Sequence, residues 1–477
     1  MRNNGTTHGS SPPHVVLFPF MAKGHTIPLL HFAHLLLRRG VTVTIFTTPA
    51  NHPFVSKSLN DTATSIITLP FPDNISPHIP AGTESTDKLP SMSLFYDFAA
   101  ATVAMQPHYE QALETLPHVT FMVTDAFLWW TLHSATRFSI PRLYFFGMSC
   151  YSSCVTGEAM RGGIFNGSQP DGELVALTRF PWIKLCKDDF EASFKNIDPS
   201  SLQHDFNVKV FSTMASSYGV LVNSFYELEP TFIDYMNMEV EGSPKSWCVG
   251  PFFLAEPTTK SSVEPGMKTK WVRWLDQKLE EKCSVLYVAF GSQAEISKEQ
   301  LKEIAIGLEE SEVSFLWVIR KDDGSISSGY EERLKGRGMI VREWVDQREI
   351  LMHESVKGFL SHCGWNSVLE SICAGVPILA WPLMADQHVN TRMINEEIKV
   401  GFRVETQNGS VRGFVKWEAL RKTVKELMDE EKGKEARKNV NEMADLAKKA
   451  MQEGGSSWST LNALLNEMCQ KKETLEE

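Results

Sequence analysis

The stretch WVDQREILMHESVKGFLSHCGWNSVLESICAGVPILAWPLMADQ, residues 344–387, carries the clearest structural pattern in the chain. The apolar run at 358–361 predicts a strand, and a glycine-containing turn follows it. A helix is predicted to begin near Asn366 or Ser367, and the run at 377–381 predicts the next strand. Strand, helix and strand in this order are typical of a parallel sheet that helices cover on both faces.

The same alternation extends through both halves of the chain. In the N-terminal half, we predict strands at 14–20, 41–48, 65–70, 119–124 and 141–146, and helices at 27–39 and 91–116. In the C-terminal half, we predict further strands at 284–290, 315–319 and 339–342, and closing helices at 416–427 and 434–451. Another helix opens at Ser297 with a capping box to Gln300, and its apolar stripe comprises Leu301, Ile304, Ala305 and Leu308.

The stretch at 251–267 separates the two halves. It is rich in Pro, Ser, Thr, Glu and Lys and has no periodicity, which is typical of a linker. We therefore predict an α/β fold with two doubly wound, Rossmann-like domains that face each other across a cleft. Their predicted bounds are 1–250 for an N-terminal acceptor-binding domain, 251–267 for the linker, 268–454 for a C-terminal domain, and 455–477 for a helix that packs back on the N-terminal domain. In such sheets, ligands bind beyond the carboxyl ends of the strands.

Composition narrows the range of functions. The chain has 477 residues, of which 42% are hydrophobic and 22% charged, so it has enough apolar residues for a sizeable core. Its formal net charge of −11 argues against nucleic acid or an anionic membrane as the main partner, because both favour a basic surface. A local patch that binds an anionic ligand is still compatible with this charge.

The cysteines and the N-terminus predict a cytoplasmic protein. None of the eight cysteines is spaced as CxxC, and no histidine cluster at zinc-ligand spacing accompanies them, so we expect free thiols in a reducing compartment. The first residues, MRNNGTTHGSSPP, lack the apolar core of a signal peptide, and no run of 18 apolar residues predicts a membrane span. A monomer is the default expectation.

Polar residues around the turn after 358–361 are suited to a nucleotide. A strand-to-helix turn exposes N–H groups that suit a phosphate, and His362, Asn366 and Ser367 add side-chain donors. Glu370 lies on the same helical face and can accept hydrogen bonds from a ribose. Trp344 offers a flat face to a base. Taken singly, each feature is more often structural, since most such turns are only turns and most lone tryptophans belong to a core.

Taken together, these residues resemble a known signature. The matching residues are Trp344, Gln347, His353, the run HCGWNS at 362–367, Glu370, GVP at 375–377, WP at 381–382 and DQ at 386–387. Their spacings resemble those of the donor-binding signature of plant secondary-metabolite glycosyltransferases, which are family 1 UDP-dependent enzymes with the GT-B fold. WLD at 274–276, FGS at 290–292 and GHTIPLL at 24–30 extend the resemblance over essentially the whole chain. Asp346 and Lys357 depart from the usual residues, at positions that are not expected to touch the sugar.

The resemblance implies a role for each donor-site residue. Trp344 would stack on uracil, with the Val345 backbone at the edge of the base. Gln347 and Glu370 would hold the ribose. The diphosphate would contact Ser292, His362, Asn366 and Ser367, and the sugar would face Trp365, Asp386 and Gln387. In this family, glutamine at the last signature position accompanies glucose and histidine accompanies galactose, so Gln387 favours UDP-glucose as co-substrate.

His25 and Asp125 are the candidate catalytic residues. Both follow predicted strands, and a histidine is the side chain whose ordinary pKa suits a general base near neutral pH. A carboxylate that orients such a base also stabilises the imidazolium. The alternative interpretations are a local hydrogen bond for His25 and a helix N-cap for Asp125. In the resembling family, a Gly-His after the first strand and an aspartate about a hundred residues later form the catalytic dyad.

The dyad implies an inverting single displacement. His25 would take the acceptor proton, the acceptor would attack the anomeric carbon, and UDP would leave. Since no Asp/Glu pair stands at metal-binding spacing and the family needs no metal, we predict metal independence. The predicted lining of the acceptor pocket is apolar, which suits a phenolic, flavonoid or terpenoid acceptor, and comprises Phe20, Met21, Phe95, Phe127, Phe146 and Met148. The sequence leaves open the acceptor itself and whether oxygen, nitrogen, sulfur or a carboxylate is glycosylated.

Other functional classes lack their motifs. A nicotinamide-dependent oxidoreductase would need GxGxxG after a strand, and no P-loop is present. A glycoside hydrolase would need two carboxylates, whereas the sequence offers a histidine and an aspartate. Two further alternatives keep the same fold: an enzyme that uses another UDP-sugar, or a non-catalytic protein that binds one.

Overall fold

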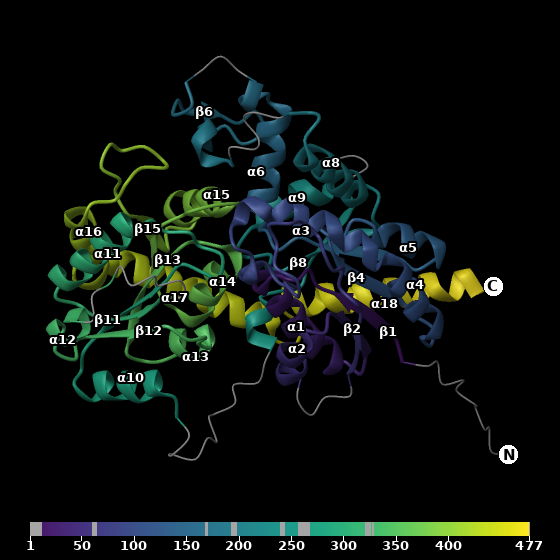
Figure 1. Ribbon diagram of the computed structural model, residues 1–477, viewed down its shortest axis with the longest axis horizontal. Coiled ribbons are helices and arrows are strands. Elements are labelled where there is room, and N and C mark those ends of the chain that lie inside the picture. The colour runs from purple at the N-terminus through teal and green to yellow at the C-terminus, as the bar shows by residue number, and fades with distance from the viewer. Residues whose placement is uncertain are drawn as a thin grey trace. The chain divides into compact units, whose positions relative to one another are not determined.

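The computed structural model describes residues 12–59, 64–166, 170–191, 198–238, 244–255, 268–319, 326 and 329–476 (Figure 1). The chain divides into two compact units. Unit 1 comprises Met1–Phe146, Asp205–Leu221 and Thr460–Glu477, and unit 2 comprises Gly147–His204 and Val222–Ser459. The domain boundaries expected from the sequence stay a prediction.

The first sheet has seven strands in the order β3-β2-β1-β4-β5-β8-β9, and its pairs from β3 to β8 are parallel. Its strands are β1 (His14–Phe18), β2 (Thr42–Thr47), β3 (Ser65–Thr68), β4 (Phe121–Asp125), β5 (Arg142–Phe145), β8 (Gly219–Val222) and β9 (Lys245–Cys248). All five residues of β1 are buried, because helices cover both faces of the sheet and leave neither side to water. Register places Val15 opposite Val43 on one side and Phe121 on the other.

Helices before, between and after these strands cover the first sheet. They are α1 (Lys23–Leu37), α2 (His52–Ser58), α3 (Phe95–Ala101), α4 (Gln106–Thr115), α5 (Thr131–Arg137) and α8 (Leu202–Ala215), with short 3₁₀ turns at Thr86–Lys88, Met92–Leu94 and Thr102–Met105. The last helix, α18 (Ser456–Glu476), contacts unit 1 through two hydrogen bonds. Arg39 Nε donates to Asn462 Oδ1 at 3.1 Å, and the Tyr218 hydroxyl donates to Glu467 Oε1 at 2.7 Å.

The second sheet has six parallel strands in the order β12-β11-β10-β13-β14-β15. They are β10 (Val285–Ala289), β11 (Ser314–Val318), β12 (Gly338–Val341), β13 (Val356–Ser361), β14 (Ile378–Ala380) and β15 (Gly401–Arg403). Alternate residues of β10 enter two different apolar clusters: Leu286 and Val288 lie in one, and Val285 and Tyr287 in the other. Both faces of this sheet are therefore covered, as expected for a doubly wound unit.

The helices described in unit 2 vary widely in length. They are α6 (Cys150–Arg161), α9 (Pro230–Met238), α10 (Lys270–Glu280), α11 (Lys298–Glu310), α12 (Gly329–Arg333), α13 (Gln347–Leu351), α14 (Trp365–Ala374), α15 (Gln387–Arg392), α16 (Trp417–Asp429) and α17 (Glu431–Met451). A two-stranded antiparallel hairpin, β6 (Val175–Ala176) with β7 (Lys184–Leu185), and 3₁₀ turns at Ile164–Asn166 and Lys187–Asp189 complete the segment after α6. A π-helix, η7 (Met393–Glu397), continues α15.

Of three local predictions, two are wrong. The helix α1 begins at Lys23 and not at Ile27, so His25 lies in its first turn; Pro28, which indicates a helix start, is tolerated inside it. The helical segment expected at 91–116 is confirmed, because the 3₁₀ turn at Met92–Leu94, α3, the 3₁₀ turn at Thr102–Met105 and α4 follow one another without a break. The capping box is half formed: Ser297 Oγ accepts from Gln300 N at 3.2 Å, but the Gln300 amide pairs with the Val415 backbone.

The first residues of the predicted linker at 251–267 have regular structure, which the sequence analysis did not predict. Residues Phe252–Ala255 form a 3₁₀ turn, η6, in which Phe252 and Phe253 are buried. The rest of the predicted linker, 256–267, lies outside the described residues. The apolar stripe of α11, in contrast, is buried as predicted.

Candidate active site

His25 and Asp125 meet at one edge of the first sheet. His25 lies in the first turn of α1, directly after β1, and Asp125 is the last residue of the neighbouring strand β4. The His25 Nδ1 atom lies 2.6 Å from Asp125 Oδ2. The carboxylate is fully buried, whereas 20% of the histidine side chain is exposed. A carboxylate partner makes Nδ1 the protonated nitrogen of the neutral ring, which leaves Nε2 as the basic nitrogen.

The second oxygen of Asp125 is also used. Asp125 Oδ1 accepts a hydrogen bond from the Phe127 backbone N–H at 3.0 Å, which fixes the carboxylate in the turn after β4. The helix that follows, α5, has Trp130 and not Asp125 at its N-cap position. The N-cap alternative for Asp125 therefore does not describe this residue.

Aromatic rings surround His25. The Phe127 ring lies 5.3 Å from the His25 ring and packs on Phe95 at 5.3 Å and on Phe146 at 5.4 Å. These three phenylalanines are half-buried and present an apolar wall beside the histidine. Phe206 of α8, which the sequence analysis missed, packs on Phe127 at 6.1 Å.

Three of the predicted acceptor residues are placed differently. Phe20 is fully buried and Met21 is 3% exposed, so both lie behind the half-buried wall and not in it. Phe20 contacts His25 and Phe127 from that side, at 5.9 and 5.3 Å between ring centroids. Met148 is half-buried and belongs to unit 2.

In unit 2, the predicted ribose-binding residues lie together. Gln347 opens α13 and Glu370 lies on α14, and Gln347 Nε2 donates to Glu370 Oε2 at 2.5 Å and to Ser367 Oγ at 3.0 Å. The Tyr287 hydroxyl donates to Gln347 Oε1 at 3.3 Å. Trp344, in the loop before α13, has 45% of its surface exposed, which is unusual for so large an apolar ring. The neighbouring residue Val345 is buried.

His362 is enclosed by two glycines. A Cβ atom on Gly291, which has a φ of +80°, would lie 2.8 Å from His362 Nε2, and a Cβ on Gly364 would lie 2.7 Å from the same atom. Gly364 is also the N-cap of α14, the ten-residue helix whose first turn carries Asn366 and Ser367. The half-buried Ser292 follows Gly291 directly. Gly291 and Gly364, which are far apart in the sequence, therefore both leave room for the His362 ring at the N-terminus of α14.

Trp365 and Asn366 bind a loop that the sequence analysis did not single out. The Trp365 indole N–H donates to the Asn223 carbonyl at 2.8 Å, and Asn223 Nδ2 lies 3.4 Å from Asn366 Oδ1. Trp365 is only 2% exposed. Its ring therefore lies in the interior, and its backbone N–H lies in the first helical turn, where N–H groups lack intrahelical acceptors. The contact with the sugar that the resemblance implies for Trp365 stays a prediction.

Hydrogen bonds fix Asp386 and Gln387, the two residues that the resemblance predicts to face the sugar. Asn390 Nδ2 donates to Asp386 Oδ2 at 2.9 Å and to the Cys363 carbonyl at 3.0 Å, which joins α15 to the turn before α14. The Gln387 side-chain oxygen accepts from the Leu383 and Met384 N–H groups, both at 2.9 Å. The amide NH₂ of Gln387 is therefore the end that remains for a ligand. Burial raises the pKa of the Cys363 thiol to about 12, so this cysteine is not a nucleophile at neutral pH.

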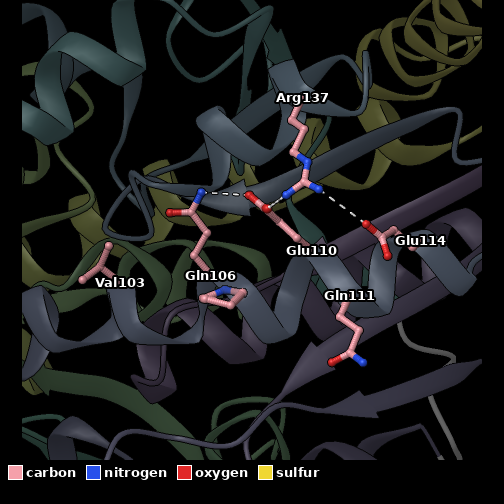
Figure 2. Close-up of a pocket in the computed structure, with 7 residues that line it drawn as sticks. Val103, Gln106, Glu110, Gln111, Glu114 and Arg137 are labelled. Carbon is pink, nitrogen blue, oxygen red and sulfur yellow. Dashed lines mark hydrogen bonds and ion pairs between the residues drawn. The ribbon is translucent and has the colours of Figure 1, made fainter.

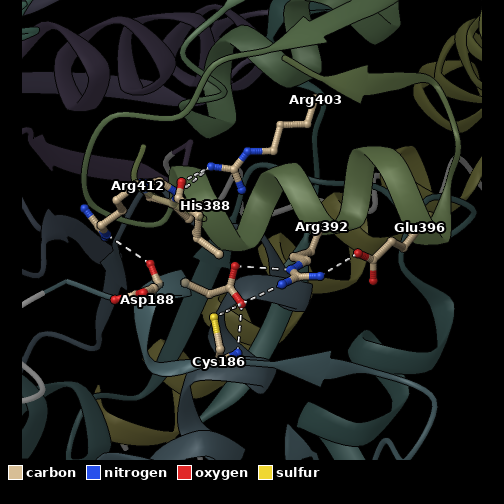
Figure 3. Close-up of polar contacts among 9 residues, drawn as sticks. Cys186, Asp188, His388, Arg392, Glu396, Arg403 and Arg412 are labelled. Atoms are coloured by element: carbon tan, nitrogen blue, oxygen red, sulfur yellow. Dashed lines mark hydrogen bonds and ion pairs between the residues drawn. The ribbon is translucent and has the colours of Figure 1, made fainter. Parts of the chain in front are cut away.

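A cluster of charged side chains holds the other end of α15 (Figure 3). Arg392 donates to both carboxylate oxygens of Asp189, at 3.1 and 3.0 Å, and to Glu396 at 2.8 Å. Burial, together with the charges of Arg412, Arg403 and Arg392, lowers the pKa of His388 to about 2, so this histidine is neutral. The bidentate Arg–Asp pair fixes the helix that carries Gln387.

Asp276 and His353, which also belong to the matching motifs, form a structural contact. His353 Nε2 lies 3.3 Å from Asp276 Oδ1, and Lys268 Nζ donates to Asp276 Oδ2 at 2.8 Å. The hydrogen bond from Lys268, followed by that from His353, lowers the pKa of Asp276. These residues connect α10 to the end of α13.

A separate hollow of about 560 Å³ lies on unit 1 (Figure 2). Its acidic residues are already paired: Arg137 contacts Glu110 and lies 3.5 Å from Glu114, and Gln106 donates to Glu110 at 2.8 Å.

Within the described ranges, no group of three or more His, Cys, Asp or Glu side chains is placed to hold a metal ion. The helices in those ranges include none that is both long and apolar enough to span a membrane, and none of the eight cysteines, all within those ranges, forms a disulfide.

Comparison with known proteins decides the family. Residues 276–449 match the family model described as UDP-glucoronosyl and UDP-glucosyl transferase. UDP-glycosyltransferase 90A1 of Arabidopsis thaliana is 54% identical over 471 residues, which cover 97% of each chain. The chain belongs to the plant UDP-glycosyltransferases. UDP-glucose flavonoid 3-O-glucosyltransferase 7 of Fragaria ananassa is 34% identical to this UDP-glycosyltransferase, over 95% of this chain and 96% of the relative.

Solved structures of the family confirm the fold. UGT73P12 of Glycyrrhiza uralensis, complexed with glycyrrhetinic acid 3-O-monoglucuronide, is 28% identical with a TM-score of 0.86 over 98% of each chain. UGT2 of Phytolacca americana, complexed with UDP-2-fluoro-glucose and pterostilbene, is 30% identical with a TM-score of 0.79, over 96% of this chain and all of the other. This UDP-glycosyltransferase therefore has the predicted GT-B fold, uses a UDP-sugar as co-substrate and acts on a small-molecule acceptor.

Proposed function

We propose that this UDP-glycosyltransferase transfers glucose from UDP-glucose to a small-molecule acceptor with inversion, using His25 as the base and Asp125 as its orienting carboxylate. The observation that carries the proposal is the 2.6 Å contact between these side chains, beside a wall of half-buried phenylalanines. A base that is one-fifth exposed, with its partner fully buried, is placed to meet an acceptor hydroxyl while its orientation stays fixed.

The reaction is a single displacement. His25 Nε2 takes the hydroxyl proton as the acceptor oxygen bonds to the anomeric carbon, and the bond from that carbon to the diphosphate oxygen breaks, so UDP leaves with the electron pair. The proton ends on His25, where the Asp125 carboxylate stabilises the imidazolium. One displacement converts an α-linked donor into a β-glucoside.

The donor residues support the UDP-sugar half of this reaction. The first turn of α14 offers N–H groups to the leaving diphosphate, with Ser292, His362, Asn366 and Ser367 as candidate side-chain contacts. Gln347 and Glu370, already 2.5 Å apart, are the candidate ribose contacts, and the exposed ring of Trp344 the candidate stacking surface for uracil. The Gln387 amide, held by its oxygen, would donate to the sugar, and glutamine here favours glucose.

The acceptor is proposed to be planar or polycyclic and largely apolar. Phe95, Phe127 and Phe146 pack edge-to-face on one another through Phe127 and offer ring surfaces beside His25. Such a wall suits a phenolic, flavonoid or terpenoid skeleton with one reactive hydroxyl. Metal independence, a monomeric state and a cytoplasmic location, all expected from the sequence, belong to the same proposal.

The test is UDP release from UDP-glucose in EDTA, with a panel of phenolic, flavonoid and terpenoid acceptors. Wild type is compared with His25→Ala and with His108→Ala, which changes an exposed histidine of the same unit. We expect acceptor-dependent release that falls about 10²- to 10⁴-fold in His25→Ala only, and a β-linked product by NMR. Undiminished release in His25→Ala would refute the base, an α-linked product would refute inversion, and preference for UDP-galactose or UDP-glucuronate would refute glucose as the donor sugar.

A further inference from the structure

A buried arginine lies directly behind the dyad. Arg142 is the first residue of β5, the strand beside β4, and it is only 2% exposed. Its guanidinium reaches along the sheet to the end of β4, where Nη2 donates to the Asp125 backbone carbonyl at 3.2 Å. Nε donates to Thr124 Oγ1 at 2.7 Å and to Thr131 Oγ1 at 3.2 Å, and Nη1 donates to Ser217 Oγ at 2.7 Å.

All four of these acceptors are uncharged oxygens. They give each guanidinium nitrogen a hydrogen-bond acceptor but do not neutralise its charge, and moving an ion from water into a protein interior costs several kcal/mol of folding free energy. Burial lowers the pKa of Arg142 to about 10, and the largest opposing influence is the charge of Asp125. Arg142 therefore stays protonated at neutral pH, and the Asp125 carboxylate is its main counter-charge.

Both carboxylate oxygens of Asp125 already have partners other than Arg142. Asp125 Oδ2 contacts His25 and Oδ1 accepts from Phe127 N–H. An arginine in direct contact with the carboxylate would compete with His25 for an oxygen. Because Arg142 binds the peptide carbonyl of Asp125 instead, its charge acts on the carboxylate while both carboxylate oxygens keep their partners.

We propose that Arg142 is a positioning residue of the dyad, which supplies a counter-charge to the Asp125 carboxylate and holds the end of β4 so that this carboxylate faces His25. The inference rests on the proposed role of His25 as the base. In this role, Arg142 does not contact the substrate.

The sign of the effect follows from the charges. The active dyad, neutral His25 with ionised Asp125, carries one negative charge, and adding a proton removes that charge. A nearby positive charge favours the active form. Loss of the Arg142 charge should therefore raise the pH at which the dyad takes up a proton, and the acid limb of the kcat profile should move to higher pH.

Few other groups near the guanidinium titrate in this range. The charged or titratable groups that face it are Asp125 and the phenols of Tyr109 and Tyr144, and His25 lies beyond Asp125. Phenols ionise near pH 10, so neither tyrosine changes charge on the acid limb. The remaining partners, Thr124, Thr131 and Ser217, have uncharged hydroxyl groups.

The experiment cancels the arginine charge without removing the arginine. Ser217, at the far end of the guanidinium from Asp125, is changed to aspartate, and Ser217→Asn is the uncharged control of the same size. In Ser217→Asp the new carboxylate pairs with Arg142, and we expect the acid limb of kcat to move up by about one pH unit relative to Ser217→Asn, with KM for UDP-glucose unchanged. Arg142→Gln should show the same shift, and Arg142→Lys, which keeps the charge, should not.

Coincident acid limbs in Ser217→Asp and Ser217→Asn would overturn the proposal, whatever their kcat values, because a purely structural role predicts loss of rate or stability without a shift in pH. The two Ser217 variants decide the question even if Arg142→Gln does not fold. His25→Ala, measured alongside, separates the two hypotheses: if it stays active the proposed base is wrong, and if it is inactive while the limbs coincide only the role of Arg142 is wrong.

Discussion

His25 Nδ1 and Asp125 Oδ2 lie 2.6 Å apart although 100 residues separate them in the sequence. The contact forms because β1 and β4 are neighbouring parallel strands, so the residues that follow β1 and end β4 share one edge of the sheet. Each predictable feature, a histidine after a strand and an aspartate at the end of another, is common by itself. Their meeting at a partly exposed position with apolar walls is what supports general-base chemistry.

Asp125→Asn is expected to lower kcat by about 10²- to 10⁴-fold, because an amide neither stabilises the imidazolium nor enforces protonation at Nδ1. The matched control is Asp205→Asn, which removes an exposed carboxylate of the same unit that pairs with Lys209. Initial rates at saturating UDP-glucose and acceptor measure the effect. Equal kcat values in the two variants would contradict an orienting role for Asp125.

Gly364→Ala is expected to raise KM for UDP-glucose by about 10- to 100-fold. The new Cβ would lie 2.7 Å from His362 Nε2, so the imidazole must leave the helix N-terminus where the diphosphate is proposed to bind. Gly172→Ala is the control, because a Cβ there meets no atom within 4 Å. Isothermal titration with UDP measures the affinity directly, and an unchanged affinity in Gly364→Ala would exclude His362 from the donor site.

Trp344→Ala is expected to weaken UDP binding by about 10- to 100-fold, since stacking of a base on an aromatic ring contributes about 1–3 kcal/mol. Trp182→Ala removes another strongly exposed tryptophan of the same unit, one whose indole N–H contacts Glu397, and should leave UDP affinity unchanged. If both variants bind UDP like wild type, Trp344 is not the stacking surface.

Glu229 is expected to make stability depend on pH. The Glu229 carboxyl is 1% exposed and accepts from Tyr151 N at 2.6 Å and from the Ser224 hydroxyl. Burial raises its pKa to about 7, so the folded protein holds a proton that the unfolded chain releases near pH 4.5. The stabilising contribution is complete below pH 4.5 and is lost as pH rises through 7, up to about 3 kcal/mol in total.

Glu229→Gln mimics the protonated form and should therefore flatten this dependence. We expect the fall in Tm between pH 5.5 and pH 7.5 to be smaller in Glu229→Gln than in wild type. Glu173→Gln, at an exposed position, is the control and should follow wild type. Parallel Tm curves for all three proteins would show that Glu229 does not take up a proton on folding.

The fold class could be predicted because its evidence is local. Buried parallel strands are continuous apolar runs, and the runs at β1, β2, β10 and β13 are unmistakable in the sequence. The strands that were missed, β6, β7, β8, β9 and β15, have two to four residues, and most of them contain a glycine or a charged residue that interrupts the apolar run. The equally short β14 was found because it lies inside the longer run at 377–381. The start of α1 was misplaced by four residues, because the helix begins at Lys23 and contains Pro28.

Local pattern placed His25 and Asp125 after predicted strands and suggested a phosphate-binding turn, but it left other interpretations of each residue open. The resemblance to the family signature selected the candidate dyad and the candidate donor residues. Only the folded chain decided which side chains share an environment. In the fold, the Trp365 ring is buried and its indole N–H donates to Asn223. Phe20 and Met21 are buried behind the half-buried phenylalanines. Phe206 and Arg142 lie near the dyad although they belong to other elements. Contacts of this kind depend on strand order and on helix packing between distant segments, so a local sequence pattern does not predict them.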